Sequence, residues 1–345
     1  MIHVGRPVIL GIAPSRRPSP RSAVRGVLPP AVALILLAAA VVPVGAQDPS
    51  GSTEPGTAHS GTDMPRSVVV TTEVLGSVVR DLVGDGATVH VLMEGGADPH
   101  TWQPSARDSE ELFEADLVIA NGLGLEEGLV TILEQAESEG VTIFEATDHV
   151  AGRDPAATEP DATHEGDPAD ADHEHAAGDP HFWLDPLAMR DVVVALVPVL
   201  ADAGIAVDAR ATGIVTALEA LDAELAAILA VVPGERRTLV TGHQSLGYFA
   251  DRYGFTIVGT VIPGLTTSGE PSARDLAELI DEIRGRGVPA IFTEVGTPAA
   301  VADAVAAESG ARIVELRDAQ LPEDGSYPTL LRDIARSVAD ALVGA

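Results

Sequence analysis

The sequence predicts an α/β protein of two lobes, each a mainly parallel sheet covered by helices, joined by a long rigid interlobe helix. Short β-branched runs alternate with helical patterns from Arg66 onward, and the same alternation begins again after Pro233. Between these two stretches an apolar stripe repeats at helical spacing. Alternation of strands with helices is typical of parallel sheets that are buried on both faces.

The first stretch contains four runs rich in Val, Ile and Thr that have the length and composition of strands. These runs are Ser67–Thr72, Thr88–Met93, Asp116–Ala120 and Val141–Phe144. Helical patterns lie between them at Val74–Val83, Ser105–Ala115 and Glu126–Glu139. Ser105 and Asp108 form the capping pair that opens the second of these helices. We assign 66–186 to the N-terminal lobe.

The second stretch, 236–345, repeats this order and is assigned to the C-terminal lobe. Its predicted strands are Arg237–Thr241, Thr256–Val258, Ala290–Thr293 and Arg312–Leu316. Its predicted helices are Gln244–Tyr253, a helix capped by Ser272 and Asp275 that runs to about Arg286, Ala299–Ser309 and Tyr327–Val343.

A linking helical segment, 187–235, separates the lobes. Its apolar stripe alternates spacings of four and three residues, at Ile214, Leu218, Leu221, Leu225, Ile228 and Val232. At ~1.5 Å per residue such a helix would span nearly 30 Å, about the width of a domain. An ordinary packed helix would give the same stripe, but we favour a strut that joins the lobes.

The chain begins with features of an export signal. Five Arg and no acidic residue precede the apolar run Ala31–Val42, which small residues follow up to Ala46. This order is typical of a secretory signal peptide, assigned to 1–46, and the run is short for a membrane span, which needs ~20 residues. We therefore expect an exported, periplasmic or extracytoplasmic protein. Residues 47–65 are rich in Gly, Ser, Thr and Pro and indicate a flexible tether.

Composition excludes several functions. The 52 acidic residues against 21 basic ones give a formal net charge of −31, so the chain would be repelled by nucleic acid and would attract cations. Cysteine is absent, which excludes thiolate catalysis, cysteine zinc ligands and anchoring as a Cys-linked lipoprotein. Any metal site must use His, Asp and Glu.

One phrase occurs twice. Residues 98–102 read Asp-Pro-His-Thr-Trp, and residues 179–183 read Asp-Pro-His-Phe-Trp. The proline before each histidine favours a stiff, extended loop, which suits a fixed mount for an imidazole. His100 and His181 are therefore candidate metal ligands.

Two further candidates follow predicted strands of the second lobe. His243 comes directly after Arg237–Thr241, and Asp318 lies just beyond Arg312–Leu316. Ligands of open α/β sheets gather outside the carboxyl ends of the strands, so both side chains could meet His100 and His181 across a cleft. Three imidazoles and one carboxylate form a tetrahedral set for Zn²⁺, whereas manganese favours more oxygen ligands. The carboxylates competing with Asp318 for the fourth position are Glu294, Glu315 and Asp324.

A segment between the two repeated phrases breaks the α/β pattern. Residues 148–180 hold ten acidic residues and four His, with many Ala, Pro and Gly, and indicate a mobile acidic loop. His164, His173 and His175 make it a candidate for weak auxiliary metal binding.

These motifs resemble the zinc/manganese solute-binding proteins of bacterial ABC importers, the ZnuA-like cluster A-I family. The matching phrases are GGADPHTWQP, which ends at Pro104, DPHFWLDP at 179–186, the stretch from His243 to Phe249, GEPSARDL at 269–276 and IFTEVG at 291–296. The resemblance covers the chain from Arg66 onward. It implies that His100, His181, His243 and Asp318 are the ligands, and that the partners are an ABC permease and its ATPase. The family's manganese members carry Glu at the third position, so His243 favours zinc.

Three functional hypotheses follow. The leading one is a monomeric, non-enzymatic protein that captures Zn²⁺ as transported cargo and delivers it to the permease; a manganese-binding member of the family is the alternative within that class. A secreted zinc hydrolase would need a coordination position left open for water, and the chain has no HExxH motif. A secreted zinc buffer or adhesin is the third.

Overall fold

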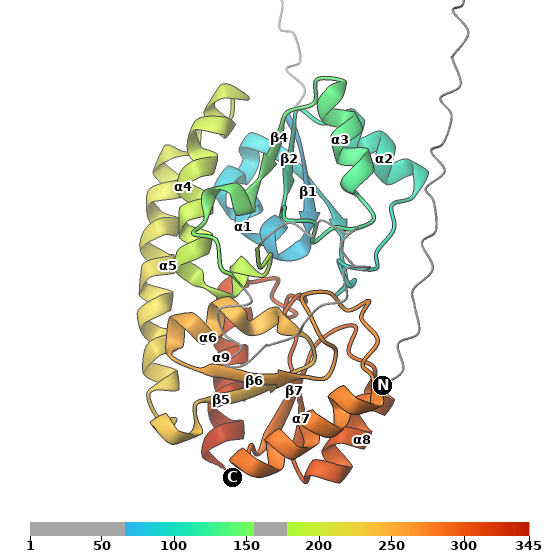
Figure 1. Cartoon of the computed structure of the whole chain (residues 1–345). Helices are drawn as coiled ribbons and strands as arrows, with labels where there is room; N and C mark the ends of the chain where they lie inside the picture. Colours follow the sequence, from blue (N-terminus) through green and yellow to red (C-terminus); the bar gives the residue numbers. More distant parts are fainter. Residues whose placement is uncertain (1–65, 155–177, 345) are drawn as a thin grey trace, which may run out of the picture. The chain divides into compact units, whose positions relative to one another are not determined.

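Two four-stranded parallel sheets form the framework of the computed structural model, which describes residues 66–154 and 178–344 (Figure 1). All of these residues belong to one compact unit of the chain. The predicted α/β fold with two lobes is confirmed.

The first sheet has the strand order β2-β1-β3-β4. Its strands are β1 (Arg66–Thr72), β2 (Ala87–Met93), β3 (Leu117–Ala120) and β4 (Ile143–Glu145). The helices of this lobe are α1 (Glu73–Val83), α2 (Ala106–Phe113) and α3 (Val130–Ser138). Alternate residues of the central strand face opposite ways, because Val68 packs into the core that contains α1 whereas Val69 packs under α2 and α3.

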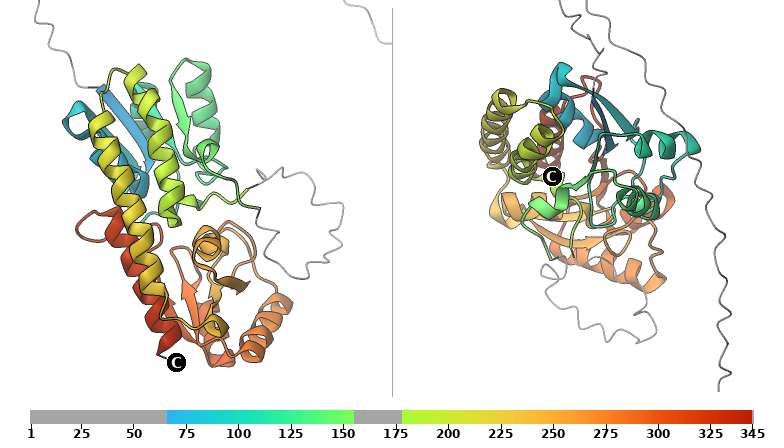
Figure 2. Two further views of the ribbon diagram at one scale, coloured as in Figure 1. Left: turned by 90° about the vertical axis from the view of Figure 1, so that its left-hand side faces the viewer. Right: turned by 90° about the horizontal axis from the view of Figure 1, so that it is seen from above.

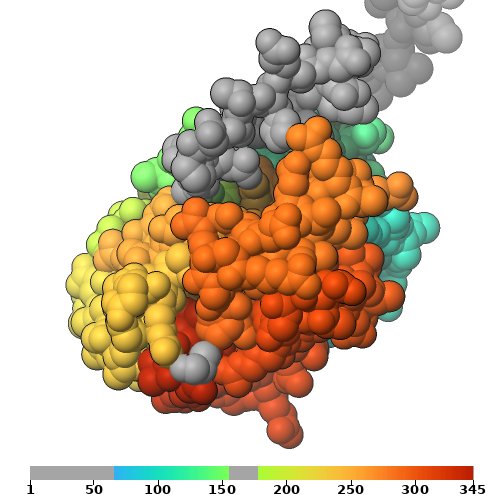
Figure 3. Space-filling view, turned by 60° about the horizontal axis from the view of Figure 1, so that its bottom comes forward, coloured from blue at the N-terminus to red at the C-terminus, as the bar shows by residue number. Residues whose placement is uncertain are grey.

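The second sheet repeats this arrangement with the order β6-β5-β7-β8. Its strands are β5 (Thr238–Thr241), β6 (Thr256–Thr260), β7 (Ala290–Thr293) and β8 (Arg312–Glu315). The helices around it are α6 (Gly247–Tyr253), α7 (Ala273–Arg286) and α8 (Ala299–Ser309). Leu279 and Val305 cover one face of this sheet, and α7 and α8 form much of the surface in the space-filling view (Figure 3).

Three long helices lie along one side of the lobes: α4 (Pro186–Asp202), α5 (Asp208–Leu229) and α9 (Tyr327–Val343). Helix α5 packs against α1 and α4 in the first lobe and against α9 in the second, so it bridges both (Figure 2). The stripe residues Leu218, Leu221 and Leu225 are buried, as expected for a strut in contact with both lobes.

One hydrophobic core runs through both lobes. It includes Val70 of β1, Leu196 of α4, Leu225 of α5, Phe292 of β7 and Ile334 of α9. Two smaller clusters lie on the outer faces of the two sheets. Because the main core is continuous, the lobes share buried surface and are not simply tethered by a loop.

Helix α3 differs from the sequence prediction, which placed its start at Glu126. The structure begins this helix at Val130. The Glu126 carboxylate instead accepts hydrogen bonds from the backbone N–H groups of Asn121 (2.7 Å) and Gly122 (3.3 Å) and from the Thr71 hydroxyl (2.6 Å). These bonds hold Glu126 in a buried turn at the ends of β1 and β3, where it satisfies backbone groups that a helix would leave unpaired.

Several predicted segments lie outside the described residues. They are the signal peptide 1–46, the tether 47–65 and most of the acidic loop, including His164, His173 and His175. Within 66–154 and 178–344, no helix combines the length and the apolar character that a membrane crossing requires.

Replacement of Leu225 by Ala is expected to lower the free energy of unfolding by about 2–5 kcal/mol, because the side chain is completely buried in the core that runs through both lobes. Val194→Ala on α4 is the matched control, since Val194 is 54% exposed and its loss should change stability by less than about 0.5 kcal/mol. Urea unfolding of both variants measures the difference. Equal destabilisation by the two substitutions would contradict a core that depends on α5.

Stability should also depend on pH through the contact between α5 and α6. The Nε and Nη2 groups of Arg252 donate to the two oxygens of the Asp222 carboxylate, at 2.8 and 2.6 Å, and these bonds hold the pKa of Asp222 below its usual range. A lowered pKa in the folded state stabilises the protein above the unfolded-state pKa of about 3.9, and this stabilisation is lost as pH falls toward the folded value.

Asp222→Asn should therefore lower the free energy of unfolding by about 1 kcal/mol at neutral pH. The difference from the unsubstituted protein should shrink below about pH 4. Asp202→Asn, at the exposed end of α4, is the control. A difference that stays constant across this range would show that the Arg252 contact does not act through charge.

Candidate metal centre

The two repeated phrases build the same local structure. In the loop after β2, the Asp98 carboxylate accepts a hydrogen bond from the backbone N–H of His100 (3.1 Å). In the loop before α4, the Asp179 carboxylate accepts one from the N–H of His181 (2.9 Å). Each aspartate thus closes a tight turn two residues before a histidine, which explains why the phrase suits a fixed imidazole.

The second lobe contributes its residues from loops at the carboxyl ends of its strands. His243 follows β5, where the hydroxyl of Thr241 donates to the His243 carbonyl. Asp318 follows β8, and its backbone carbonyl accepts a hydrogen bond from the Trp183 indole of the first lobe (2.8 Å). Both residues are nearly inaccessible to solvent.

The three imidazoles converge from the two lobes. One ring nitrogen of each of His100, His181 and His243 lies within 4.8 Å of the others, a spacing that could hold a metal ion. The Nε2 atoms of His181 and His243 are 3.3 Å apart. Ring centroids are separated by 5.1 to 5.5 Å, so the three rings form one cluster.

Asp318 lines the same small pocket as the three histidines, which holds about 10 Å³ of free space. Among the described residues, it is not part of the closely spaced set of ligand atoms that the three imidazoles form. It is nevertheless the acidic residue of the second lobe that faces into this pocket. The predicted residues therefore occupy one pocket, with the carboxylate beside the imidazole cluster.

Burial determines the charge of the pocket. Burial, with repulsion from the other two rings, lowers the pKa of His100 to about 2, and burial likewise lowers the pKa of His243. Burial raises the pKa of Asp318 to about 6, with repulsion from Glu294 as the next cause. Neutral imidazoles offer a lone pair to a cation, so the cluster is chemically suited to a divalent metal.

The other carboxylates considered for the fourth position lie elsewhere. Glu315 is exposed at the end of β8. Asp324 accepts hydrogen bonds from Ser326 and Thr329 at the start of α9. Glu294 is completely buried, and burial raises its pKa to about 8. Its Oε2 lies 3.5 Å from Nδ1 of His243, on a side of that ring away from Nε2.

Hydrogen bonds between the lobes surround the pocket. The hydroxyls of Thr266 and Thr267 in the second lobe donate to Glu127 (2.8 Å) and Asp98 (2.7 Å) in the first. The Tyr327 hydroxyl donates to the backbone carbonyl of Trp183 (2.7 Å). Asp98, Thr267 and Trp183 line the pocket, so two of these contacts join the lobes at its walls.

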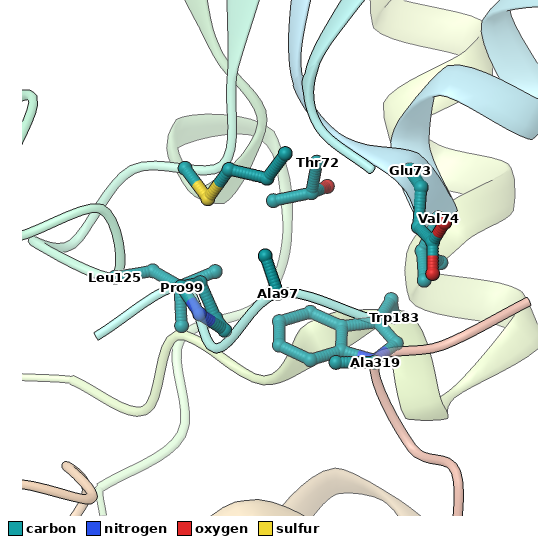
Figure 4. A pocket seen from close by; sticks show the side chains of 9 residues that line it. Thr72, Glu73, Val74, Ala97, Pro99, Leu125, Trp183 and Ala319 are labelled. Atoms are coloured by element: carbon teal, nitrogen blue, oxygen red, sulfur yellow. The ribbon is translucent and has the colours of Figure 1, made fainter. Parts of the chain in front are cut away.

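Trp183 separates the pocket of the three histidines from a second cavity. Its indole, with Pro99 and Ala319, lines both spaces. The second cavity is mainly apolar and includes Ala97 and Leu125 (Figure 4). The ring centroid of Trp183 lies 5.3 Å from that of His181, so the indole forms an apolar wall beside the imidazole cluster.

No role was predicted from the sequence for Asp179, Glu127, Thr266 or Thr267. The repeated phrase contains a signal for Asp179, because a carboxylate two residues before each histidine can close a turn. No comparable signal exists for Glu127, Thr266 and Thr267, since their contacts join segments far apart in the chain.

The chain is similar to known proteins over most of its length. The family model "Zinc-uptake complex component A periplasmic" matches residues 68–341. The zinc-binding protein TroA of Treponema pallidum is 30% identical over 248 residues, covering 70% of this chain and 74% of TroA. Its solved structure has a TM-score of 0.67 at 26% identity and covers 80% of this chain and 99% of that one.

Two other relatives differ in the metal that their names give. The zinc-binding protein AdcA of Streptococcus pyogenes serotype M1 is 28% identical over 261 residues, 72% of this chain, but the match spans only 49% of AdcA. The manganese-binding lipoprotein MntA of Halalkalibacterium halodurans is 26% identical over 270 residues, 76% of this chain and 81% of MntA. Together with the family match, these similarities show that the chain belongs to the ZnuA family of zinc- and manganese-binding solute-binding proteins of ABC importers, which are transport proteins and not enzymes.

Proposed function

We propose that this protein captures Zn²⁺ in the pocket between its lobes and delivers it to an ABC importer permease. The observation that carries the proposal is the convergence of three buried imidazoles within 4.8 Å of one another. His100, His181 and His243 would supply nitrogen ligands, and Asp318, which lines the same pocket, would supply oxygen. This set matches the closed, four-coordinate sites that zinc prefers in binding proteins.

Zinc is favoured over manganese by the chemistry of the donors. Imidazole nitrogen suits zinc, whereas manganese is generally held by carboxylate, carbonyl and water oxygens. Manganese stays the second candidate because the relative MntA is named for manganese binding. The two cargoes make different demands on Asp318, since a manganese site would gain more from an added oxygen ligand.

Delivery to a permease follows from the family and not from the pocket alone. We propose that the protein works outside the cytoplasm as a monomer and that an ABC permease with its ATPase receives the ion. Release would require the lobes to separate at the pocket, because the four proposed ligands come from both of them. The hydrogen bonds of Thr266 and Thr267 would then break with the site.

Tight binding of one zinc ion should depend on each histidine. In a chelator-buffered titration of the purified protein, intrinsic fluorescence should respond to one equivalent of Zn²⁺, because Trp183 lies beside His181 and bonds to Asp318. His181→Ala should weaken zinc affinity by more than the roughly 10–100-fold loss that follows removal of a residue supporting a ligand.

His90→Ala is the matched control, since His90 is an exposed histidine on β2. The zinc affinity of this variant should equal that of the unsubstituted protein. Equal loss in both variants would indicate a general effect on folding. Binding of manganese more tightly than zinc would instead identify the alternative cargo.

Asp318→Asn tests the fourth ligand. An amide keeps the shape of the side chain but removes the negative charge, so zinc affinity should fall at least about 10-fold. Asp324→Asn, in the same loop but outside the pocket, should leave zinc affinity unchanged. Unaltered zinc affinity in Asp318→Asn would mean that the imidazoles bind the ion with an open coordination position.

A further inference from the structure

We infer that Glu294 is a positioning residue for His243, and that it holds this ring so that Nε2 faces the metal. The inference rests on the proposed function, because it concerns the same pocket. It also assigns a role to a buried carboxylate that the ligand set does not use.

The imidazoles face the centre of the pocket through one edge each. The Nε2 atoms of His181 and His243 are 3.3 Å apart, within hydrogen-bond distance of each other. Their Nδ1 atoms therefore point away from this contact, because the two nitrogens of an imidazole are directed well apart. An ion between these rings would contact Nε2 of both, and each Nδ1 would be left to a protein partner.

A carboxylate lies near Nδ1 of each ring. Asp179 lies 2.8 Å from Nδ1 of His181, Glu294 lies 3.5 Å from Nδ1 of His243, and Glu127 lies 3.7 Å from Nδ1 of His100. Only the first contact is a hydrogen bond in the described residues. The shared arrangement indicates that Glu294 serves His243 as Asp179 serves His181.

Burial and neighbouring contacts fix the position of the Glu294 side chain. Its side chain is completely buried at the end of β7, and the Thr297 hydroxyl donates to its Oε2 (3.4 Å). A side chain at position 242 would meet that same oxygen at 2.2 Å, so Gly242 provides the space that the carboxylate occupies beside His243.

Two polar atoms in this space lack hydrogen bonds. Among the described residues, neither Nδ1 of His243 nor Oε1 of Glu294 has a partner. Buried polar atoms without partners are costly, and these two belong to side chains that already face each other. A shift of roughly half an ångström would form the bond.

A hydrogen bond between Glu294 and Nδ1 would select one tautomer of His243. A carboxyl oxygen that accepts the Nδ1 proton leaves Nε2 unprotonated, with its lone pair directed into the pocket. This role also removes Glu294 from competition for the fourth coordination position, because it lies behind the ring and not beside Nε2. Glu294 would thus act on the metal through His243.

The tautomer of His243 can be measured in the absence of metal. In the full-length metal-free protein, long-range proton–nitrogen NMR of the histidine rings should show a larger share of His243 protonated at Nδ1 than in Glu294→Gln, although the Nε2 contact with His181 competes for the same proton. The His243 signals are identified by their loss in His243→Ala. Equal shares in the two proteins would overturn the inference, and this test is independent of zinc binding.

Glu294→Gln should then shift part of the His243 population to the tautomer that is protonated at Nε2. It should also weaken zinc affinity by about 10–100-fold. Glu294→Asp, which is too short to reach Nδ1, should act in the same direction if the amide variant does not fold. Glu315→Gln, at an exposed position on the neighbouring strand β8, is the matched control and should bind like the unsubstituted protein.

The outcomes separate this inference from the proposed function. If the unsubstituted protein binds zinc tightly and Glu294→Gln binds it equally well, Glu294 does not position a ligand. If the unsubstituted protein does not bind zinc, the proposed function fails, while the ring-proton measurement still decides the placement of Glu294.

Discussion

Burial of three imidazoles in one small pocket is a demanding arrangement, and the surrounding structure is organised to maintain it. A protonated ring in this place would lack solvation and would repel its two neighbours, which is why the pKa of His100 falls to about 2. Burial likewise lowers the pKa of His243, whose Nε2 lies within hydrogen-bond distance of Nε2 of His181, at 3.3 Å. A cation that binds these ring nitrogens would replace this contact, so the cluster is suited to a metal ion.

The separation of the lobes is the second requirement, because no single lobe contains the whole cluster. The continuous core along α4, α5 and α9 fixes how far apart the two sheets lie. Nearer the pocket, Thr267 bonds to Asp98, which also holds the backbone of His100. Thr266 bonds to Glu127, which lies close to the same histidine. Closure of the lobes and placement of His100 are thus parts of one hydrogen-bonded network.

Much of this structure was predictable from the sequence. The runs of β-branched residues predicted all eight strands to within a few residues of their observed bounds. The capping pairs at Ser105 and Ser272 also occur as expected. The candidate ligands His100, His181 and His243 could be recognised because two lie in a repeated phrase and one follows a strand. Their meeting in one pocket follows from the position of loops at the carboxyl ends of parallel strands.

The parts that escaped prediction depend on contacts between distant segments. The late start of α3 results from the bonds that Glu126 makes to the ends of two strands, which override its helical propensity. The place of Glu294 could not be derived either, since its neighbour His243 follows another strand, β5, and the spacing in the sequence does not reveal which ring nitrogen Glu294 approaches. Sequence patterns describe elements well, but side-chain partners across a sheet are set by packing.

The net charge of the protein and the ligand types of the pocket would contribute to metal recognition in different ways. A net charge of −31 attracts every cation and so raises the rate of encounter, but it cannot distinguish zinc from the calcium or magnesium that share the same field. Those hard cations prefer oxygen, whereas the pocket offers mainly neutral nitrogen. Exposed carboxylates therefore concentrate ions near the molecule, and under the proposed function the ion is selected in the buried imidazole pocket.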